Sequence, residues 1–498
     1  MTFAPPPERR MFANRTLNMR SVQVVGFDMD YTLVHYEVPV WETRAYAHAQ
    51  QRLVDEGLPL QDLEFDPEMF ARGLVLDLEL GNIVKANRFG YITQSSHGTQ
   101  PMLHEAQRRT YAQVWVNLSE PRWVFLNTLF SLSEACLYGQ LVDLLDRGKL
   151  GDADVEPGDY SRLYDFVKRG MDAAHLEGEL KAEIIADPEK FVVFDRDLPR
   201  ALLDLKHAGK KLFLATNSEW HYTDPMMRYV FDRYMPDGMT WRDLFDLTIV
   251  QARKPGFFTS EQGFELVNEA TNESSPHEGP LDSDRVFLGG SAKIVQEHFG
   301  VDGGVILYVG DHAYADVHVS SRLQRWRTVL VLRELEEEIQ QEIAFAGSQR
   351  QLEELMAQKV RLDHEQAMLR LAILRLDRNG KPIDGLTGDA DALQDRLRAL
   401  RPEIDALDQR IAPLAAAASS LGHSHWGPLM RAGIDKSRLA REIEGFADVY
   451  TSRVSNFLFL SPFGYLRAGR GTLPHDVASG AQVAAEPDAE PSGSTGSP

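Results

Sequence analysis

FDMDYTL, residues 27–33, places two aspartates one residue apart, directly after the apolar run SVQVVG. An apolar run rich in β-forming residues predicts a buried strand. A buried strand that ends in two carboxylates needs an explanation, because ionised groups are costly to remove from water. The residues that follow the later strands of the chain provide one.

Five more apolar runs rich in β-forming residues occur further along: EKFVVF, KLFLAT, DLTIVQ, VILYVG and RTVLVL. They alternate with helical patterns, which is typical of a Rossmann-like parallel α/β sheet. The segment DLPRALLDLKHAGKK has leucines along one side of a helix and Gly209 at its expected C-terminal cap. EKFVVF, this helix and KLFLAT therefore predict one βαβ crossover.

Chemically active side chains follow four of the predicted strands. They are Asp28 and Asp30, then Thr216, Asn217 and Ser218, then Lys254, and finally Asp311 and Asp316. Parallel strands that point the same way place such residues in one crevice at their carboxyl ends, where these sheets bind ligands. We therefore expect the two aspartates to end the first strand because they belong to an active site.

These residue types fit phosphoryl transfer through a covalent intermediate. Asp28 is the predicted nucleophile, and Asp30 is the predicted acid for the leaving oxygen and base for the attacking water. Two carboxylates need a cation if they are to approach a phosphate. We expect Asp28, Asp311 and the backbone carbonyl of Asp30 to hold Mg²⁺.

The other residues at this edge are expected to bind the phosphate. Thr216, with its neighbours Asn217 and Ser218, supplies polar groups, and Lys254 supplies an ammonium that stabilises charge in the transition state. We expect Asp316 to orient Lys254 or a metal-bound water rather than to bind the metal directly.

Composition narrows the class of protein further. The single cysteine, Cys136, excludes an intramolecular disulfide and a thiolate metal cluster, so oxygen ligands and Mg²⁺ are favoured over zinc. The net charge of −21 argues against binding a nucleic-acid polymer. No stretch is long and apolar enough to span a membrane, and the first residues lack a secretory signal, so we expect a cytoplasmic protein.

At 498 residues the chain is too long for one ordinary core. The gap of more than 150 residues between the first two strands predicts an inserted, mostly helical cap domain. The expected divisions are an N-terminal segment with the first core strand (1–39), the cap (40–187), the catalytic core (188–333), a helical coiled-coil hairpin (334–420), a C-terminal helical part packing on the core (421–478) and a disordered tail (479–498).

The hairpin is predicted from leucines that recur every seventh residue. One series is Leu355, Leu362, Leu369 and Leu376, and the second is Leu393, Leu400, Leu407 and Leu414. The intervening segment DRNGKPIDGLTGD is typical of a turn, so the two series predict an antiparallel pair of helices with an apolar seam. The seam either packs within one chain or forms a contact between subunits.

Four motifs in order, DMDYT, LATNS, RKPGFF and GDHAYAD, resemble those of the haloacid dehalogenase superfamily. The resemblance is closer to its cytosolic purine 5'-nucleotidases, because LGNIVKANRFG, SSHGT, FLNTLF and SPFGYL are also similar to that family over roughly residues 20–475. It implies a Mg²⁺-dependent hydrolase of purine nucleoside 5'-monophosphates, typically inosinate and guanylate, that can also transfer phosphate to a nucleoside. It further implies a dimer or tetramer.

The resemblance also implies residues that contact the substrate's base and ribose. Phe130 matches an aromatic that packs on the purine, although Ser131 replaces the asparagine that follows it in the family. The remaining matches lie in KRGMDAAHLEGELK: Asp172, His175, Lys181 and an arginine whose place is shared by Lys168 and Arg169.

Asn127, Tyr314 and Arg322 are candidates for an effector site, because the family shows an asparagine, an aromatic and a lysine at these places. Glu442 and Phe446 depart from the family's pattern there. Two alternatives to the nucleotidase remain open. One is a phosphatase of the same mechanism that acts on another small phosphomonoester, since the cap determines the substrate. The other is a scaffold that binds partners through the hairpin.

Overall fold

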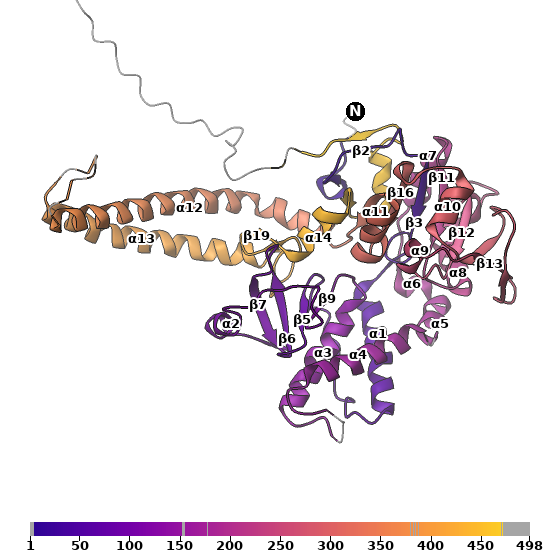
Figure 1. Cartoon of the computed structure of the whole chain (residues 1–498), viewed down its shortest axis with the longest axis horizontal. Helices are drawn as coiled ribbons and strands as arrows, with labels where there is room; N and C mark the ends of the chain where they lie inside the picture. Colours follow the sequence, from indigo (N-terminus) through magenta and orange to yellow (C-terminus); the bar gives the residue numbers. More distant parts are fainter. Residues whose placement is uncertain are drawn as a thin grey trace, which may run out of the picture.

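A ten-stranded sheet lies at the centre of the computed structural model (Figure 1). The structure describes residues 4–151, 155–176, 178–378, 380, 381, 383, 385, 386, 388–469 and 471, with the side chains of 173–176 excepted. The strands of this sheet are β1 (Met11–Ala13), β3 (Val24–Phe27), β11 (Lys211–Ala215), β12 (Leu247–Val250), β13 (Phe264–Val267), β14 (Ser274–Pro276), β15 (Val286–Gly289), β16 (Ile306–Gly310), β17 (Arg327–Val331) and β20 (Val449–Thr451).

The strand order is β1-β20-β17-β16-β3-β11-β12-β15-β13-β14. All neighbours from β20 to β15 pair in parallel, while β1 at one edge and β13 and β14 at the other pair antiparallel. The expected Rossmann-like sheet is therefore confirmed. β3 occupies its centre, between β16 and β11, where successive crossovers leave in opposite directions.

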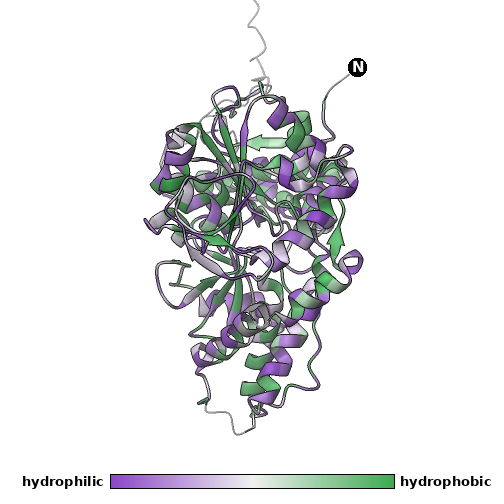
Figure 2. Ribbon diagram, turned by 90° about the vertical axis from the view of Figure 1, so that its right-hand side faces the viewer, coloured by the Kyte–Doolittle hydropathy of each residue, from purple (hydrophilic) through white to green (hydrophobic). Residues whose placement is uncertain are grey.

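Alternate residues of β3 face the two sides of the sheet. Val25 and Phe27 belong to the large apolar cluster that continues into the cap, and Val24 belongs to a second cluster on the other face. Gly26 lies against the ring of Phe213, which an added Cβ would approach to 2.1 Å. Figure 2 shows hydrophobic strands enclosed by helices whose hydrophilic parts face outward.

The helices and helical turns of the core connect these strands. They are α6 (Pro188–Phe191), α7 (Leu198–His207), α8 (Trp220–Phe231), η2 (Asp232–Tyr234), η3 (Trp241–Leu244), α9 (Gly256–Thr259), α10 (Ala292–Phe299), η4 (Gly303–Val305), the π-helical turn η5 (Ala313–His318) and α11 (Val319–Gln324).

The predicted crossover that begins at EKFVVF is wrong in its first strand. The segment forms only β10 (Val192–Val193), which pairs antiparallel with β4 (His35–Tyr36) and not with the main sheet. α7 does lead into β11 as expected. The apolar pattern of β10 reflects burial beside the loop that follows β3, and a pattern of burial does not identify the strand's partner.

The insertion after β3 is built from helices and a second sheet. Its helices are α1 (Val38–Asp55), α2 (His104–Thr110), α3 (Ser131–Asp146), α4 (Tyr160–Leu176) and α5 (Glu179–Ala186). Its antiparallel sheet, in the order β8-β7-β6-β5-β9, contains β5 (Val75–Asp77), β6 (Asn82–Ala86), β7 (Ile92–His97), β8 (Gln100–Pro101) and β9 (Trp123–Phe125). Helices supply most of its regular structure, but the expectation of a mostly helical cap did not include this sheet.

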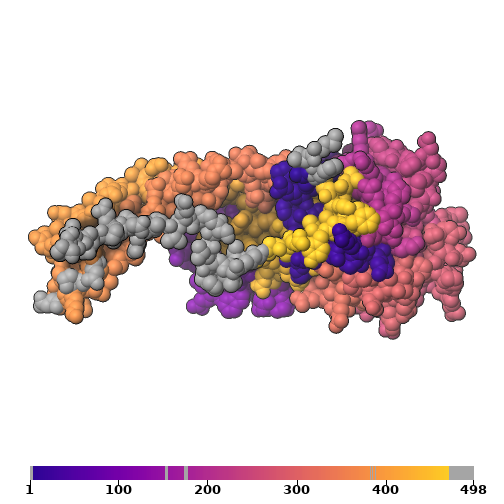
Figure 3. All heavy atoms as spheres, turned by 90° about the horizontal axis from the view of Figure 1, so that it is seen from above, coloured from indigo at the N-terminus to yellow at the C-terminus, as the bar shows by residue number. Residues whose placement is uncertain are grey.

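The leucine repeats form two long helices, α12 (Leu335–Asp377) and α13 (Ala390–Ser419), that project from the body as an arm (Figures 1 and 3). The repeat leucines pack between α12 and α13 of the same chain. Fully or partly buried there are Leu355, Leu362, Leu369, Leu376, Leu393, Leu400, Leu407, Ile411 and Leu414. Of the two readings of the seam, the structure therefore shows the one internal to the chain.

The C-terminal part lies beside the N-terminal segment on the core (Figure 3). Besides α14 (Arg438–Phe446) and η6 (Val454–Phe459), it adds strand β20 to the main sheet, which the expectation of a helical part did not include. The remaining short elements are η1 (Pro7–Arg9), β2 (Leu17–Asn18), β18 (Arg431–Ala432), β19 (Asp435–Lys436) and β21 (Tyr465–Leu466). The predicted disordered tail, 479–498, lies outside the described residues.

Among the described residues, none of the helices combines the length and the apolar character that crossing a bilayer requires.

Candidate active site

Four neighbouring parallel strands have their carboxyl ends together at one end of the sheet. They are β16, β3, β11 and β12. Asp311, Asp28, Thr216 and Lys254 follow them, and all four residues are buried. The register of β3 is held to the end, because the backbone amide of Asp28 donates to the carbonyl of Val309 at 2.9 Å. The parallel sheet thus gathers side chains from four distant segments.

Lys254 lies at the centre of this group. Its Nζ is 2.7 Å from Oδ1 of Asp28 and 2.7 Å from Oδ1 of Asp316. It also donates to the hydroxyl of Tyr308 at 3.2 Å, which in turn donates to the carbonyl of Ala215 at 3.0 Å. The ammonium is therefore fixed beside Asp28, and Asp316 has the contact with Lys254 that the sequence led us to expect.

Gly310, the glycine before Asp311, has no side chain and so allows the Asp316 side chain to pack against the end of β16. A Cβ added at Gly310 would lie 2.6 Å from atoms of the Asp316 side chain. The other carboxylate oxygen of Asp316, Oδ2, accepts a hydrogen bond from the backbone amide of His312 at 3.1 Å. The tight turn after β16 therefore folds Asp316 back toward the strand end.

Burial of several carboxylates together changes their acidity. Burial raises the pKa of Asp28 to about 7; Lys254 opposes this increase, whereas Asp316 and Asp30 add to it. Burial, with Asp28 and Asp316, raises the pKa of Asp311 well above its usual range. Burial disfavours the ammonium of Lys254, but Asp28 and Asp316 outweigh that effect and raise its pKa well above normal. One ammonium does not offset three buried carboxylates.

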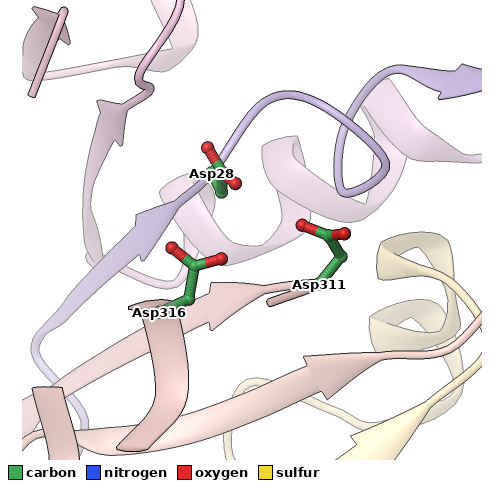
Figure 4. A group of neighbouring side chains, drawn as sticks. All are labelled: Asp28, Asp311 and Asp316. Atoms are coloured by element: carbon green, nitrogen blue, oxygen red, sulfur yellow. The ribbon is translucent and has the colours of Figure 1, made fainter. Parts of the chain in front are cut away.

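The donor set fits a hard divalent cation. Oxygens of Asp28, Asp311 and Asp316 lie within 4.8 Å of one another, and Figure 4 shows these side chains converging from the end of β3 and from the segment after β16. Oδ2 of Asp311 is buried with no hydrogen-bond partner in the described part of the chain. Oxygen ligands and an excess of negative charge are what Mg²⁺ requires.

Asp30 lies beside this cluster but is held by different groups. Its Oδ1 accepts from the Tyr36 hydroxyl at 2.5 Å, and its Oδ2 accepts from the Ser218 hydroxyl at 2.8 Å. The Tyr222 hydroxyl donates to that of Tyr36 at 2.9 Å. These contacts fix the orientation of the Asp30 carboxyl.

Two side chains of the segment after β11 form hydrogen bonds with Lys254 and Asp30. Asn217 exchanges two hydrogen bonds with the backbone of Lys254, at 2.7 and 3.2 Å, and Ser218 donates to Asp30. The hydroxyl oxygen of Thr216 accepts from the Ser218 amide at 3.0 Å, and its proton is free to point elsewhere. Of the three predicted phosphate-binding side chains in this segment, Thr216 is the one that does not hold Asp30 or Lys254 in place.

Arg72 of the insertion is a residue that the sequence did not identify. Its buried guanidinium donates to the backbone carbonyl of Asp311 at 2.7 Å and to that of Asn127 at 2.8 Å, and it lies 3.4 Å from Glu334. It thereby ties the inserted domain to the turn that carries Asp311. An isolated arginine outside a motif gives no signal of such a role.

The predicted substrate residues do not all lie together. Phe130 packs its ring 4.6 Å from that of Tyr31 in the loop after β3, and Lys181 forms an ion pair of 2.5 Å with Glu219, which follows Ser218. Both therefore lie beside the loops that follow β3 and β11, hereafter the catalytic loops. Arg169 instead pairs with Glu56 at 3.7 Å, at the opposite end of α1 from the loop after β3.

The other predicted substrate positions are on α4. Lys168 and Asp172 are exposed and lie near Glu134, on whose pKa they have opposing effects: Lys168 lowers it and Asp172 raises it, while burial, the largest cause, raises it. The side chain of His175 lies outside the described residues. Among the described side chains, those of Lys168 and Asp172 form no hydrogen bond or ion pair with the catalytic loops.

Two of the three effector candidates share one surface. Tyr314 is half exposed and packs on His318, whose ring is 4.0 Å from that of Phe446. Burial lowers the pKa of His318, and nearby Arg322 lowers it further. Asn127 is connected to Arg72 through its backbone carbonyl. These placements leave the effector role a prediction.

A buried carboxylate at a switch point, a lysine from a neighbouring strand and a capping insertion are the features expected of a phosphoric monoester hydrolase of the haloacid dehalogenase type. The particular family follows from the sequence: residues 11–478 match the model of the 5' nucleotidase family, and the chain belongs to that family. A 5'-nucleotidase domain-containing protein of Dictyostelium discoideum is 26% identical over 479 residues, which cover 94% of this chain and 74% of that protein.

Solved structures give only weak overlaps. An archaeal β-phosphoglucomutase from Pyrococcus sp. strain ST 04 is 12% identical, with a TM-score of 0.29 over 62% of this chain and 86% of that one. A predicted phosphoglycolate phosphatase from Haemophilus somnus is 14% identical, with a TM-score of 0.27 over 62% of this chain and 85% of that one. The fold is assigned here from the sheet itself.

Proposed function

We propose that this hydrolase removes phosphate from purine nucleoside 5'-monophosphates with Mg²⁺ and through an aspartyl-phosphate on Asp28. The observation that carries the proposal is the contact of the Lys254 ammonium with Asp28 Oδ1, 2.7 Å, next to the oxygens of Asp311. An ammonium in this place screens the nucleophile's charge from the incoming phosphate and then stabilises the charge of the transition state.

The chain's own residues divide the reaction between them. Oδ1 of Asp28 accepts from the Met29 amide and contacts Lys254, so Oδ2 is the oxygen assigned to attack phosphorus. The bond from phosphorus to the nucleoside's 5'-oxygen breaks, and Asp30 gives that oxygen a proton. Asp30 then takes a proton from the water that attacks the intermediate and releases Asp28 and inorganic phosphate. A nucleoside hydroxyl in place of water would give phosphotransfer.

Asp28, Asp311 and the backbone carbonyl of Asp30 would hold Mg²⁺, which would supply positive charge to offset that of the phosphoryl oxygens. Asp316 faces Lys254 and keeps the ammonium in place. Thr216 supplies its hydroxyl proton to a phosphoryl oxygen. Each of these roles uses a group that lies at the carboxyl end of the parallel strands.

Tyr36→Phe tests the role of Asp30. The change removes the hydroxyl 2.5 Å from Asp30 Oδ1 and should lower kcat about 10-fold with KM nearly unchanged, because part of the benefit of a positioned acid and base is lost. The matched control is Tyr138→Phe, since the buried hydroxyl of Tyr138 has no partner among the described residues. Equal kcat values for the native enzyme and Tyr36→Phe would remove Asp30's orientation from the mechanism.

Substrate choice is assigned to Phe130 and Lys181, because both lie beside the catalytic loops. Phe130 is partly buried against Tyr31 and Trp41, with ring centroids 4.6 and 5.6 Å away, and offers a flat surface to a base. A purine has more area to stack than a pyrimidine. Lys181 is a donor, so it favours the 6-oxo group of inosine and guanosine over the amino group of adenosine.

The test compares kcat/KM for the 5'-monophosphates of inosine, guanosine, adenosine, cytidine and uridine. Phe130→Ala should reduce the preference for purines, and Lys181→Ala should reduce the preference for 6-oxo purines by about 10-fold, the effect of losing one hydrogen bond to a charged group. Arg169→Ala, which changes a residue paired with distant Glu56, is the control. Equal kcat/KM for all five nucleotides would favour another phosphomonoester as substrate.

A further inference from the structure

The exposed side of α12 carries a second row of residues, apolar at five of six positions and distinct from the seam with α13. The row consists of Met356, Val360, Asp363, Ala367, Leu371 and Leu374, hereafter the outer stripe. All six residues are exposed, and the four large apolar ones are exposed by 43, 63, 39 and 47% in chain order. Spacings of three and four residues place them on one face of the helix.

This stripe is not part of the packing within the hairpin. The seam uses Leu355, Leu362 and Leu369, and ion pairs such as Arg396 with Glu365, 2.7 Å, join α12 to α13. The arm projects from the body (Figures 1 and 3). Single exposed apolar residues are ordinary, but a row of them along a projecting helix is typical of an interaction surface.

The spacing of the outer stripe has a nearly two-fold symmetric pattern. Measured from residue 365, its members lie 9, 5 and 2 positions before and 2, 6 and 9 positions after. Two copies of α12 that pair antiparallel about residue 365 therefore place Met356 of each directly opposite Leu374 of the other, and Val360 within one position of Leu371. An interface in which both copies use the same patch requires such a pattern.

The charges beside the stripe fit the same arrangement. Glu353 of one copy would come level with Asp377 of the other, and Arg378, four residues after Leu374 on the same helix face, would be the cation beside Glu353. The two-fold axis repeats this contact. Asp363 of one copy would lie opposite Ala367 of the other and therefore one helical turn from Arg370 of that other copy. Within the described part of the chain, the guanidinium groups of Arg370, Arg375 and Arg378 have no carboxylate partner. Opposite charges that flank an apolar helix contact set the orientation of the pair.

A groove at the base of the arm continues the surface. Its volume is about 910 Å³, and its lining includes Phe345, Leu352 and Glu353 of α12, Gln94 of β7 and the fully exposed Ile434. In the antiparallel pair, α12 of the second copy would end, at Asp377, beside Glu353 in the groove of the first copy. The groove is thus open where the tip of the second arm arrives.

We infer that the outer stripe is the self-association surface of this protein and that its partner is a second copy of the chain, paired antiparallel through α12 into a four-helix bundle. A two-fold pairing is closed, so it produces dimers and not fibres. Asp363 is the polar position in the apolar row, and a buried polar residue specifies the register of such a contact at some cost in stability.

The first test measures mass in solution by sedimentation over a range of protein concentrations. The native chain should have twice the chain mass of 56.1 kDa at the upper concentrations, and Val360→Lys with Leu371→Lys should remain at one chain mass with unchanged kcat. The matched control introduces two lysines at exposed α12 positions outside the stripe, Gln351→Lys with Gln358→Lys, and should dimerise like the native chain. A native monomer at every concentration would overturn the inference.

The second test fixes the register by cross-linking. Asp363→Cys with Ala367→Cys should give disulfide-linked dimers under mild oxidation, because each position faces the other across the axis and the native Cys136 is buried. Gln351→Cys with Gln358→Cys should give none. A native dimer that the paired lysines leave intact, or that the central cysteines do not cross-link, would show that the contact lies elsewhere.

Discussion

Asp28→Asn should abolish turnover, with a loss of about five orders of magnitude or more in kcat. An amide cannot form the acyl-phosphate that the proposed mechanism requires, and loss of a covalent nucleophile has effects of this size in other hydrolases. The variant should still fold. Its carbonyl oxygen can accept from the Met29 amide at 2.8 Å, and Lys254 retains its contact with Asp316.

The control for this variant is Asp30→Asn, which leaves the nucleophile intact. It should slow both departure of the nucleoside and hydrolysis of the intermediate, by about 10²- to 10⁴-fold. The decisive measurement is mass spectrometry of the native enzyme quenched in acid during turnover. Phosphate recovered on a residue other than Asp28, or equal activity in the Asp28→Asn enzyme, would refute the assignment.

The residues at the sheet's edge could be predicted because each follows its own strand directly. Once the strands are parallel, Asp28, Thr216, Lys254 and Asp311 must share one end of the sheet, and no knowledge of the insertion is needed. The hairpin was predictable for a similar reason: its leucine repeat is local, and α12 ends at Asp377 and α13 begins at Ala390, on either side of the predicted turn.

The groups that support these residues could not be predicted, because they depend on contacts between distant segments. Arg72 meets the carbonyl of Asp311, 239 positions away, and Tyr36 meets Asp30 only through the shape of the loop after β3. The sheet of the insertion was missed because its short strands bury polar residues. Lys85 of β6, for example, is buried and donates to the carbonyl of Pro428 at 2.7 Å.

Removal of Mg²⁺ should stop catalysis and also lower thermal stability, which gives a measurement independent of activity. A ligand present at 100 times its Kd stabilises the folded state by about 2.7 kcal/mol. For a chain of this size that corresponds to a Tm increase of about 3 °C relative to chelator-treated enzyme. Asp311→Asn keeps the size of the side chain but removes its charge, so it should abolish the increase, whereas the exposed Asp302→Asn should retain it.

The stabilisation by Mg²⁺ should also depend on pH in a definite direction. The pKa of Asp28 is about 7 in the metal-free folded protein and 3.8 ordinarily, so between these values the folded state holds a proton that the unfolded state releases. This contribution to stability is complete below pH 3.8 and is lost as the pH rises through 7.

Mg²⁺ needs the ionised carboxylate and must displace that proton at low pH. The Tm increase on adding Mg²⁺ should therefore be larger at about pH 8 than at about pH 5.5, as melting curves with Mg²⁺ and with chelator can measure. An increase that is the same at both pH values and persists in Asp311→Asn would place the cation elsewhere, and full turnover in excess chelator would remove it from the mechanism.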